Sequence, residues 1–272
     1  MEFMALDCAG FCRDCGCGHV LSADAALPHA RELMARLERR GSIGQGPAED
    51  DPRLSLEYLY GPARGQMFGV LLYADRTGGQ GVLKAFSGQY NGLWEVPGWV
   101  SPILDPAEFA RTIEHDEPRI KDLTLRMQGL GLEDPARLAM LAERRELSRN
   151  LMARIFSLYR LTNFRGQTRA LGEVFMGTSM PTGTGECCAP KLLHHAAVHG
   201  LTPLGLAEFY VGRENRSSTR RHGQFFAPCE EKCRPILGFL LCGLQGGPLQ
   251  KIADDSQRQS RERVPGMGRR IL

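Results

Sequence analysis

Three cysteines in the C-terminal half of the chain have the types and spacing of a metal site. Cys188 opens a segment with helical periodicity, and Cys229 and Cys233 open another, which runs on as RPILGFLLCGL. Unpaired amides and the helix dipole favour the thiolate at a helix start, and zinc binds thiolates. The C-x3-C spacing also places its two sulfurs on one face of a helix. We expect a zinc site formed by Cys188, Cys229 and Cys233, with Cys187 as a candidate fourth ligand.

Glu186, directly before the cysteine pair, is the candidate catalytic residue. A zinc site that activates water needs an acid/base partner, and Glu208 in a later apolar run is a weaker candidate for that role. The alternative is a structural zinc that ties two helices together, completed by Cys187 or a histidine. The sequence leaves both alternatives open.

A second cysteine cluster lies in DCAGFCRDCGCGHVL near the N-terminus. Its candidate metal ligands are Cys8, Cys12, Cys15, Cys17 and His19. The spacings are close to those of a zinc knuckle, so a structural zinc is the leading interpretation, and an iron–sulfur cluster or redox-active thiols remain alternatives. Cys242 stands alone on an apolar helix and is predicted to be a buried core thiol.

Hydrophobic periodicity predicts the elements that must position these residues. In the first half of the chain, a helix over 24–40 is followed by a β-hairpin formed by 67–75 and 81–89. In the second half, a helix over 187–200 that begins with cysteines is followed by a strand over 204–212 and by the second helix that begins with cysteines. The predicted organisation is a cysteine-rich knot (1–22), the first half of an α/β core (23–104), a helical insertion (105–165), the second half of the core (166–245) and a disordered tail (246–272).

Composition and charge limit the classes of protein to which the chain can belong. The chain has 272 residues, 42% of them hydrophobic and 24% charged, with a formal net charge of +3, which is typical of a globular protein. Neither a membrane-spanning run nor a signal peptide is evident, so we expect a cytoplasmic location and no membrane partner. Nine cysteines in a reducing compartment favour metal binding over disulfides. The glycine-bearing phrases lack the register of a phosphate loop, which argues against a nucleotide cofactor.

A polar loop, GRENRSSTRRHGQ, supplies the best basic patch for RNA. The candidate phosphate-binding residues are Arg213, Arg216, Arg220, Arg221 and His222. Arginines on such a patch would contact RNA phosphates, although an arginine-rich loop is more often only solvated.

The order of elements, helix, β-hairpin, cysteine-led helix, strand and cysteine-led helix, resembles the cytidine-deaminase-like fold. The resemblance implies an α/β protein with a three-layer α-β-α core, and a zinc held at the starts of the two helices. This chain departs from the pattern at two points. Pro190 stands where that superfamily has its catalytic glutamate, and three residues rather than two separate Cys229 from Cys233.

Longer phrases resemble the N-terminal extension of long-form bacterial RluA-type pseudouridine synthases. They are LKAFSGQYNGLWEVPGWV, PTGTGECCAPKLLHHAAVHGLTPLGLAEFYVG and GQFFAPCEEKCRPILGFLLCGL. The final ERVPGMGRRIL resembles the junction with the synthase domain of those proteins. The catalytic Arg-Leu-Asp phrase of the synthases is missing. The resemblance implies association with RNA modification, with rRNA or tRNA and a pseudouridine synthase domain as partners, but no pseudouridine formation by this chain alone.

The sequence therefore predicts a zinc-binding, RNA-targeting module with a deaminase-like core. One alternative is a zinc-dependent deaminase or hydrolase acting on a nucleobase or nucleotide. Another is a decayed fragment of a pseudouridine synthase. Whether the chain is an enzyme stays open at this point.

Overall fold

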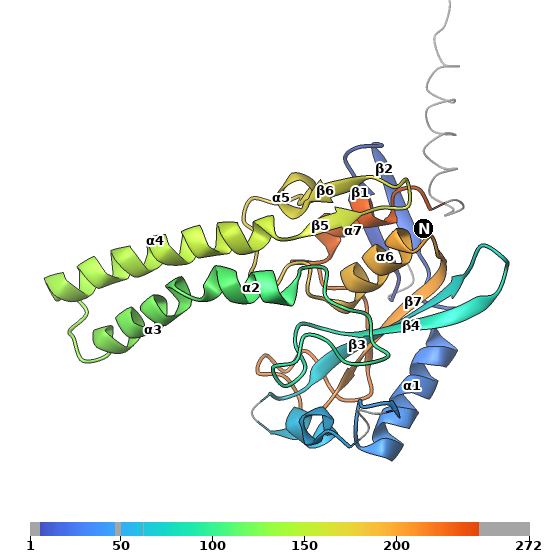
Figure 1. The fold of residues 1–272 in the computed structure, drawn as a ribbon, viewed down its shortest axis with the longest axis horizontal. Coiled ribbons are helices and arrows are strands. Elements are labelled where there is room, and N and C mark those ends of the chain that lie inside the picture. The colour runs from blue at the N-terminus through green and yellow to red at the C-terminus, as the bar shows by residue number, and fades with distance from the viewer. Residues whose placement is uncertain (1–5, 47–49, 62, 245–272) are drawn as a thin grey trace, which may run out of the picture.

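A four-stranded antiparallel sheet forms the centre of the computed structural model, which describes residues 6–46, 50–61 and 63–244 (Figure 1). The strand order is β4-β3-β7-β8. The strands are β3 (Gln66–Ala74), β4 (Gln80–Phe86), β7 (Thr202–Val211) and β8 (Phe225–Phe226). The predicted β-hairpin is present as β3 and β4, with Phe68 opposite Phe86 and Ala74 opposite Gln80.

The turn of this hairpin is built around Asp75. Its Oδ1 accepts hydrogen bonds from the backbone N–H groups of Thr77 and Gly79 at 2.8 and 2.9 Å. Gly78 has a φ of 87°, which glycine adopts without strain. The glycine-rich RTGGQ phrase therefore folds into the tight connection that the sequence predicted.

Helices cover both faces of the sheet because side chains alternate along its strands. On one face, helix α1 (Leu27–Arg40) buries Leu33 and Leu37 against Phe68 and Phe209. On the other face, α6 (Cys188–Val198) packs on β3, β4 and β7, and α7 (Arg234–Leu241) packs against α6. The starts of α6 and α7 thereby come to the same side of the sheet.

The segment that carries both tryptophans closes the α1 side of the core. Tyr90 and Trp99 are buried beside Phe68 and Phe86. The indole N–H of Trp99 donates to the backbone oxygen of Ile43 at 3.0 Å, which satisfies a buried polar group. Two short 3₁₀ helices precede this segment in the chain, Pro52–Leu54 and Leu56–Tyr60.

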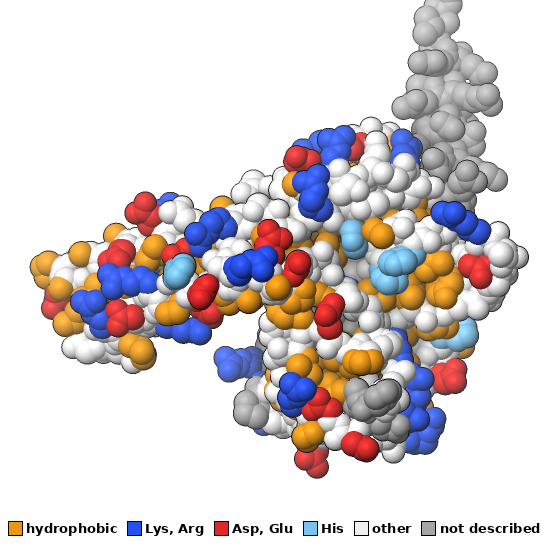
Figure 2. All heavy atoms as spheres, viewed as in Figure 1, with side chains coloured by type: hydrophobic (Ala, Val, Ile, Leu, Met, Phe, Trp, Pro, Cys, Tyr) orange, Lys and Arg blue, Asp and Glu red, His pale blue; other side chains and the backbone are white. Residues whose placement is uncertain are grey.

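Three helices project from the sheet as an arm (Figure 1). They are α2 (Pro106–Ile113), α3 (Asp116–Met127) and α4 (Pro135–Ser157). Asp105 and Asp134 stand directly before α2 and α4 and cap them by accepting hydrogen bonds from backbone N–H groups. Figure 2 shows acidic, basic and hydrophobic side chains mixed along the arm, which is a solvated surface of mixed charge.

Two smaller hairpins lie beside α7. The first pairs β1 (Cys8–Cys12) with β2 (Cys17–Leu21), and the second pairs β5 (Arg160–Thr162) with β6 (Thr168–Ala170). The short helix α5 (Leu171–Val174) follows the second hairpin. The cysteine-rich N-terminal segment is thus a β-hairpin packed on α7.

The fold is mixed α/β, as predicted, with a cysteine-bearing N-terminal hairpin. The predicted disordered tail, 246–272, lies outside the described residues. Within the described ranges, none of the helices combines the length and apolar character that a bilayer crossing requires.

Candidate metal centre

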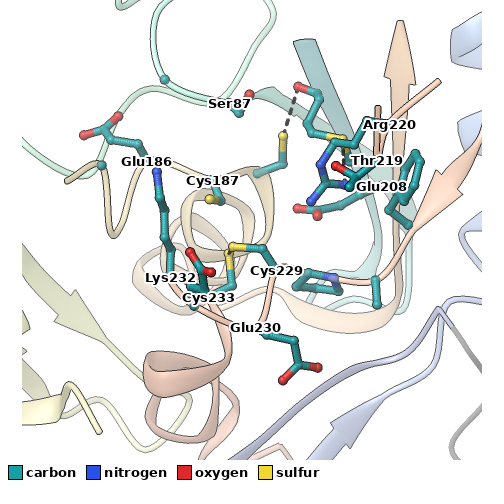
Figure 3. A pocket seen from close by; sticks show the side chains of 18 of the residues that line it. Ser87, Glu186, Cys187, Glu208, Thr219, Arg220, Cys229, Glu230, Lys232 and Cys233 are labelled. Atoms are coloured by element: carbon teal, nitrogen blue, oxygen red, sulfur yellow. Dashed lines mark hydrogen bonds between the residues drawn. The ribbon is translucent and has the colours of Figure 1, made fainter. Parts of the chain in front are cut away.

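A cavity of about 870 Å³ opens where the starts of α6 and α7 meet the end of β4 and the loop before β8 (Figure 3). Its lining includes the four cysteines of these helix starts, Cys187, Cys188, Cys229 and Cys233, together with Glu208 and Arg220. Ser87 and Gly88, directly after β4, complete one wall.

Three cysteine sulfurs come together in this cavity, those of Cys187, Cys229 and Cys233. All three lie within 4.8 Å of one another, and the Sγ atoms of Cys229 and Cys233 are 3.5 Å apart. Cys187 is the N-cap of α6 and Cys233 is the N-cap of α7. Tetrahedral zinc with Zn–S bonds of about 2.3 Å places its sulfurs about 3.8 Å apart. The three sulfurs therefore fit a zinc ion in both type and separation.

The contacts between these sulfurs shift the pKa values of the three thiols in opposite directions. The thiols of Cys187 and Cys233 lower the pKa of Cys229. Contact with Cys229 and burial raise the pKa of Cys187, and contacts with Cys187 and Cys229 raise that of Cys233. Negative charge thus gathers on the Cys229 sulfur, and metal binding would displace the protons of the other two.

Cys188, the predicted first ligand, lies outside this group. Its Sγ donates a hydrogen bond to the backbone oxygen of Met67 at 3.3 Å, and its side chain is fully buried against β3. The two neighbouring cysteines diverge because successive side chains on a helix start point in different directions. Gly69 makes room for Cys188, since a Cβ there would lie 2.6 Å from the Cys188 Cβ. Cys187, predicted as a fourth ligand, occupies the place expected for Cys188.

Glu208 on β7 is the carboxyl that accompanies the three sulfurs. The backbone N–H of Ala189 donates to its Oε1 at 2.7 Å, so the first turn of α6 orients it. Burial and the charge of Cys229 raise the pKa of Glu208 to about 7, against the lowering effects of the Ala189 hydrogen bond and the charge of Arg220. Figure 3 shows Arg220 beside Glu208 at the cavity wall. A carboxyl with this pKa can both hold and release a proton near neutral pH.

Glu186, the predicted catalytic residue, also borders the cavity, but its carboxyl contacts Tyr159 rather than the three cysteines. The hydroxyl of Tyr159 donates to its Oε1, and its Oε2 is buried without a hydrogen-bond partner among the described atoms. Burial raises the pKa of Glu186 to about 7, and the charge of Lys191 lowers it. No cysteine contributes to this shift, and Figure 3 shows the side chain pointing away from the sulfurs.

Lys191 is a buried cation that sequence reasoning missed. Its Nζ donates to the backbone oxygens of Phe86 and Gly88 at 2.8 and 3.3 Å and lies 4.7 Å from the centre of the Phe86 ring. Burial lowers its pKa. Lys191 fastens α6 to the end of β4, next to the cavity. The signal in the sequence was a lysine within the apolar stretch of a helix, which requires a partner when buried.

The predicted RNA-binding residues have different surroundings. Arg220 lines the cavity, and Arg216 is exposed at a neighbouring opening. Arg213 donates to the backbone oxygen of Gly61 at 3.0 Å. Arg221 pairs with Glu214 at 3.0 Å, and His222 contacts Glu38 at 3.1 Å. Arg216 and Arg220 are therefore the two of the set that face openings.

A second group of metal-binding side chains forms at the N-terminal hairpin. It consists of Cys12, Cys15, His19 and Cys242, whose ligand atoms lie within 4.8 Å of one another and could hold a metal ion such as zinc. Cys242 is buried as predicted, but it is not alone, since its sulfur lies with the ligand atoms of Cys12, Cys15 and His19.

Cys8 and Cys17, the other predicted ligands of the N-terminal cluster, lie outside this second group. Cys8 is four residues from Cys12 on β1, a distance of about 13 Å along a strand, and is buried in the core. The thiol of Cys17 donates to the backbone oxygen of Cys15 at 3.4 Å.

Comparisons of the chain with protein families, curated proteins and solved structures find no match. The function must therefore be argued from the site itself.

Proposed function

We propose that this chain is a zinc-dependent hydrolase of the deaminase type that acts on an amino-substituted nucleobase. The single observation that carries the proposal is the convergence of three cysteine sulfurs in an open cavity that also holds the buried carboxyl of Glu208. Zinc in structural sites has four protein ligands, whereas zinc in catalytic sites has three and a free position. The group of Cys187, Cys229 and Cys233 has the second pattern.

The arrangement of elements around the cavity supports the deaminase-like part of the proposal. A hairpin, a cysteine-led helix, a strand beside the hairpin and a second cysteine-led helix occur in the order that the resemblance implies. Sulfurs at the starts of α6 and α7 reach the same cavity because α7 packs against α6, which lies on one face of the sheet. The change from Cys188 to Cys187 shifts one ligand by a residue without changing which helix starts supply the site.

Glu208 takes the proton-transfer role in this proposal. Zinc held by three protein ligands supplies Lewis acidity and lowers the pKa of water. The Ala189 N–H fixes one oxygen of Glu208 and holds the carboxyl in place, while a pKa of about 7 suits it to accept a proton and to return it to a leaving amine. With Cys187 as the ligand, Ala189 occupies the position of the glutamate in the deaminase pattern, and Glu208 reaches the same cavity from the neighbouring strand.

The remaining walls of the cavity suit a planar polar ring. Arg220 stacks on the ring of Phe226, with its guanidinium 4.8 Å from the ring centre. Ser87 and Thr219 add hydroxyl groups to the lining. Aromatic and guanidinium planes stack on bases, and hydroxyl groups hydrogen-bond their edges.

We propose further that the base is part of an RNA, in keeping with the resemblance to the extension of RluA-type synthases. A second opening of about 400 Å³, lined by Arg64 and Arg216, shares Met67 and Ser87 with the main cavity. Two arginines beside a base-sized cavity are placed to contact a phosphate backbone. Replacing both by alanine should weaken RNA binding and reduce its salt dependence.

Ammonia release tests the proposal. The zinc-loaded chain is incubated with cytidine, adenosine, single-stranded RNA and tRNA, and ammonia is measured. We expect release from at least one substrate, and a loss on the order of 10²- to 10⁴-fold in Glu208→Gln.

Glu231→Gln is the matched control, because Glu231 is an exposed carboxyl on the rim of the same cavity. Its activity should equal that of the parent. Full activity of Glu208→Gln would remove the assigned role. A zinc-loaded parent that releases no ammonia from any of these substrates would overturn the proposed reaction.

A further inference from the structure

We propose that Cys12, Cys15, His19 and Cys242 bind a structural zinc that clamps the N-terminal hairpin to the C-terminal end of α7. The four ligand atoms lie within 4.8 Å of one another, and the Cys15 Sγ is 3.1 Å from the His19 Nε2. This site is separate from the cavity with the three cysteines.

The donor set is that of a closed zinc site. Three thiols and one imidazole complete a tetrahedral shell, which leaves no position for a substrate. Cys12, His19 and Cys242 are at most 7% exposed, so the ion would be held inside the protein. Tetrahedral zinc places sulfur and nitrogen ligands about 3.6 Å apart, close to the separations in this group. The ligands of an iron–sulfur cluster stand farther apart, because several irons and sulfides lie between them.

The hairpin itself explains why a clamp is needed. β1 and β2 have five residues each, and an isolated two-stranded hairpin of this size is marginally stable. Its turn places Cys15 near His19, and Gly16 allows that turn with a φ of 69°. Only the sulfur of Cys242 comes from elsewhere in the chain, so the ion joins the hairpin to α7.

The contact between β1 and α7 is a direct approach of two backbones. A Cβ on Gly10 would lie 2.3 Å from the backbone nitrogen of Gly238, and a Cβ on Gly238 would overlap the backbone of Phe11. Glycines at both positions let the strand lie directly on the helix. The clamp holds this contact from one end, since Cys12 ends β1 and Cys242 is the C-cap of α7.

The clamp also reaches the proposed catalytic site through α7. Cys233 caps the start of this helix and Cys242 its end, about 14 Å apart at 1.5 Å per residue. Fixing one end of so short a helix fixes the other, so the clamp holds Cys233 in position to meet Cys187. This second part rests on the metal site of the proposed function.

Zinc content of the purified full chain tests both parts. We expect two zinc ions per chain in the parent, one in Cys242→Ser and one in Cys229→Ser. Cys17→Ser is the matched control, a cysteine of the same hairpin outside the group, and should keep two. Loss of a zinc in Cys17→Ser would overturn the ligand set.

The variants separate failure of the clamp from failure of the proposed function. If the parent holds one zinc, and this zinc is lost in Cys242→Ser but kept in Cys229→Ser, the clamp is supported and the three-cysteine group is not a zinc site. If the single zinc of the parent is instead lost in Cys229→Ser and kept in Cys242→Ser, the clamp is overturned. Acid-labile sulfide in the parent, absent from Cys242→Ser, would also overturn it, because it would identify an iron–sulfur cluster.

Two further measurements apply if Cys242→Ser folds poorly. Cobalt loaded into Cys229→Ser, which keeps the clamp, should give the absorption of a tetrahedral thiolate site, and its absence overturns the proposal. Competition with a chelator should show at least 10-fold weaker zinc binding at the three-cysteine group in Cys242→Ser than in the parent. Equal binding would overturn the coupling through α7.

Discussion

Replacing Gly238 with alanine adds one methyl group where α7 touches β1. The new Cβ would lie 1.9 Å from the Phe11 backbone oxygen, 2.1 Å from the Phe11 carbonyl carbon and 2.6 Å from the Cys12 nitrogen. These are backbone atoms, so no side chain can rotate out of the way. Non-bonded heavy atoms prefer separations of about 3.5 Å, so the helix and strand must part by on the order of 1.5 Å.

The expected loss of stability follows from two opposing effects. Overpacking a core costs about 1 to 3 kcal/mol, and this contact belongs at the upper end because both partners are backbone. Alanine regains about 1 kcal/mol over glycine inside a helix. The free energy of unfolding should therefore fall by about 2 kcal/mol or more, which is roughly a 30-fold change in the ratio of folded to unfolded chain.

Urea unfolding of the zinc-loaded chain measures this loss, with Gly172→Ala as the control. Gly172 is an exposed glycine in helix α5, and a Cβ there meets nothing within 4 Å. Gly172→Ala should unfold at the same or a higher urea concentration than the parent. If Gly238→Ala unfolds together with the parent, the backbones of β1 and α7 are not in direct contact and the clamp argument loses its basis.

Gly10→Ala probes the same contact from the strand. Its Cβ would lie 2.3 Å from the Gly238 nitrogen. Because both substitutions separate the same pair of backbones, the double variant should lose less stability than the sum of the single losses. Additive losses would indicate two independent effects.

Three more predictions concern buried polar groups. Burial lowers the pKa of His194 from 6.5 to about 4, so between these pH values the unfolded chain binds a proton that the folded chain does not. The free energy of unfolding should therefore be highest above pH 6.5 and fall by up to about 3 kcal/mol towards pH 4. Urea unfolding across that pH range measures the fall, which should be shallower in His194→Gln. Trp99→Phe leaves the Ile43 oxygen without its donor and should lower the free energy of unfolding by about 1 to 3 kcal/mol in the same assay. Tyr159→Phe removes the donor to the buried Glu186 carboxyl and should cost about as much, whereas an unchanged unfolding midpoint would mean that water satisfies the carboxyl.

Local signals in the sequence were sufficient for the longer helices and for the three longest strands of the sheet. Asp105 and Asp134 stand directly before prolines that begin α2 and α4, and their carboxylates cap those helices. Gly41 ends α1 in the left-handed conformation, with a φ of 65°. Such features act within a few residues, so they can be read without knowing which elements pack together.

The choice between Cys187 and Cys188 could not be made from local signals. Both lie at the start of the same helix, and which one faces the sulfurs of Cys229 and Cys233 depends on the rotation of α6 against β3. Gly69 decides that rotation, because it leaves space for the Cys188 side chain in the sheet face. Nothing near Cys188 in the sequence indicates this partner.

Cys242 shows the same limit over a longer range. It follows His19 by more than 200 residues, and only the packing of β1 along α7 brings the two together. Periodicity placed Cys242 on the apolar helix that ends one residue before it, where a buried thiol is the usual interpretation. The N-terminal segment gave no signal for a distant ligand, because its five candidate ligands already exceed the four that a closed zinc site needs.

Glu208 could have been ranked above Glu186 from the sequence. It interrupts the apolar run LGLAEFYVG, and seven consecutive residues of β7, including Glu208, are buried. A carboxyl in the middle of such a strand costs free energy unless a partner or a function retains it. Here the partner is the Ala189 N–H at the start of the helix that supplies Cys187. The same geometry therefore satisfies the buried carboxyl and places it beside the sulfurs, which is why substitution of Glu208 should affect catalysis and substitution of Glu186 should affect stability.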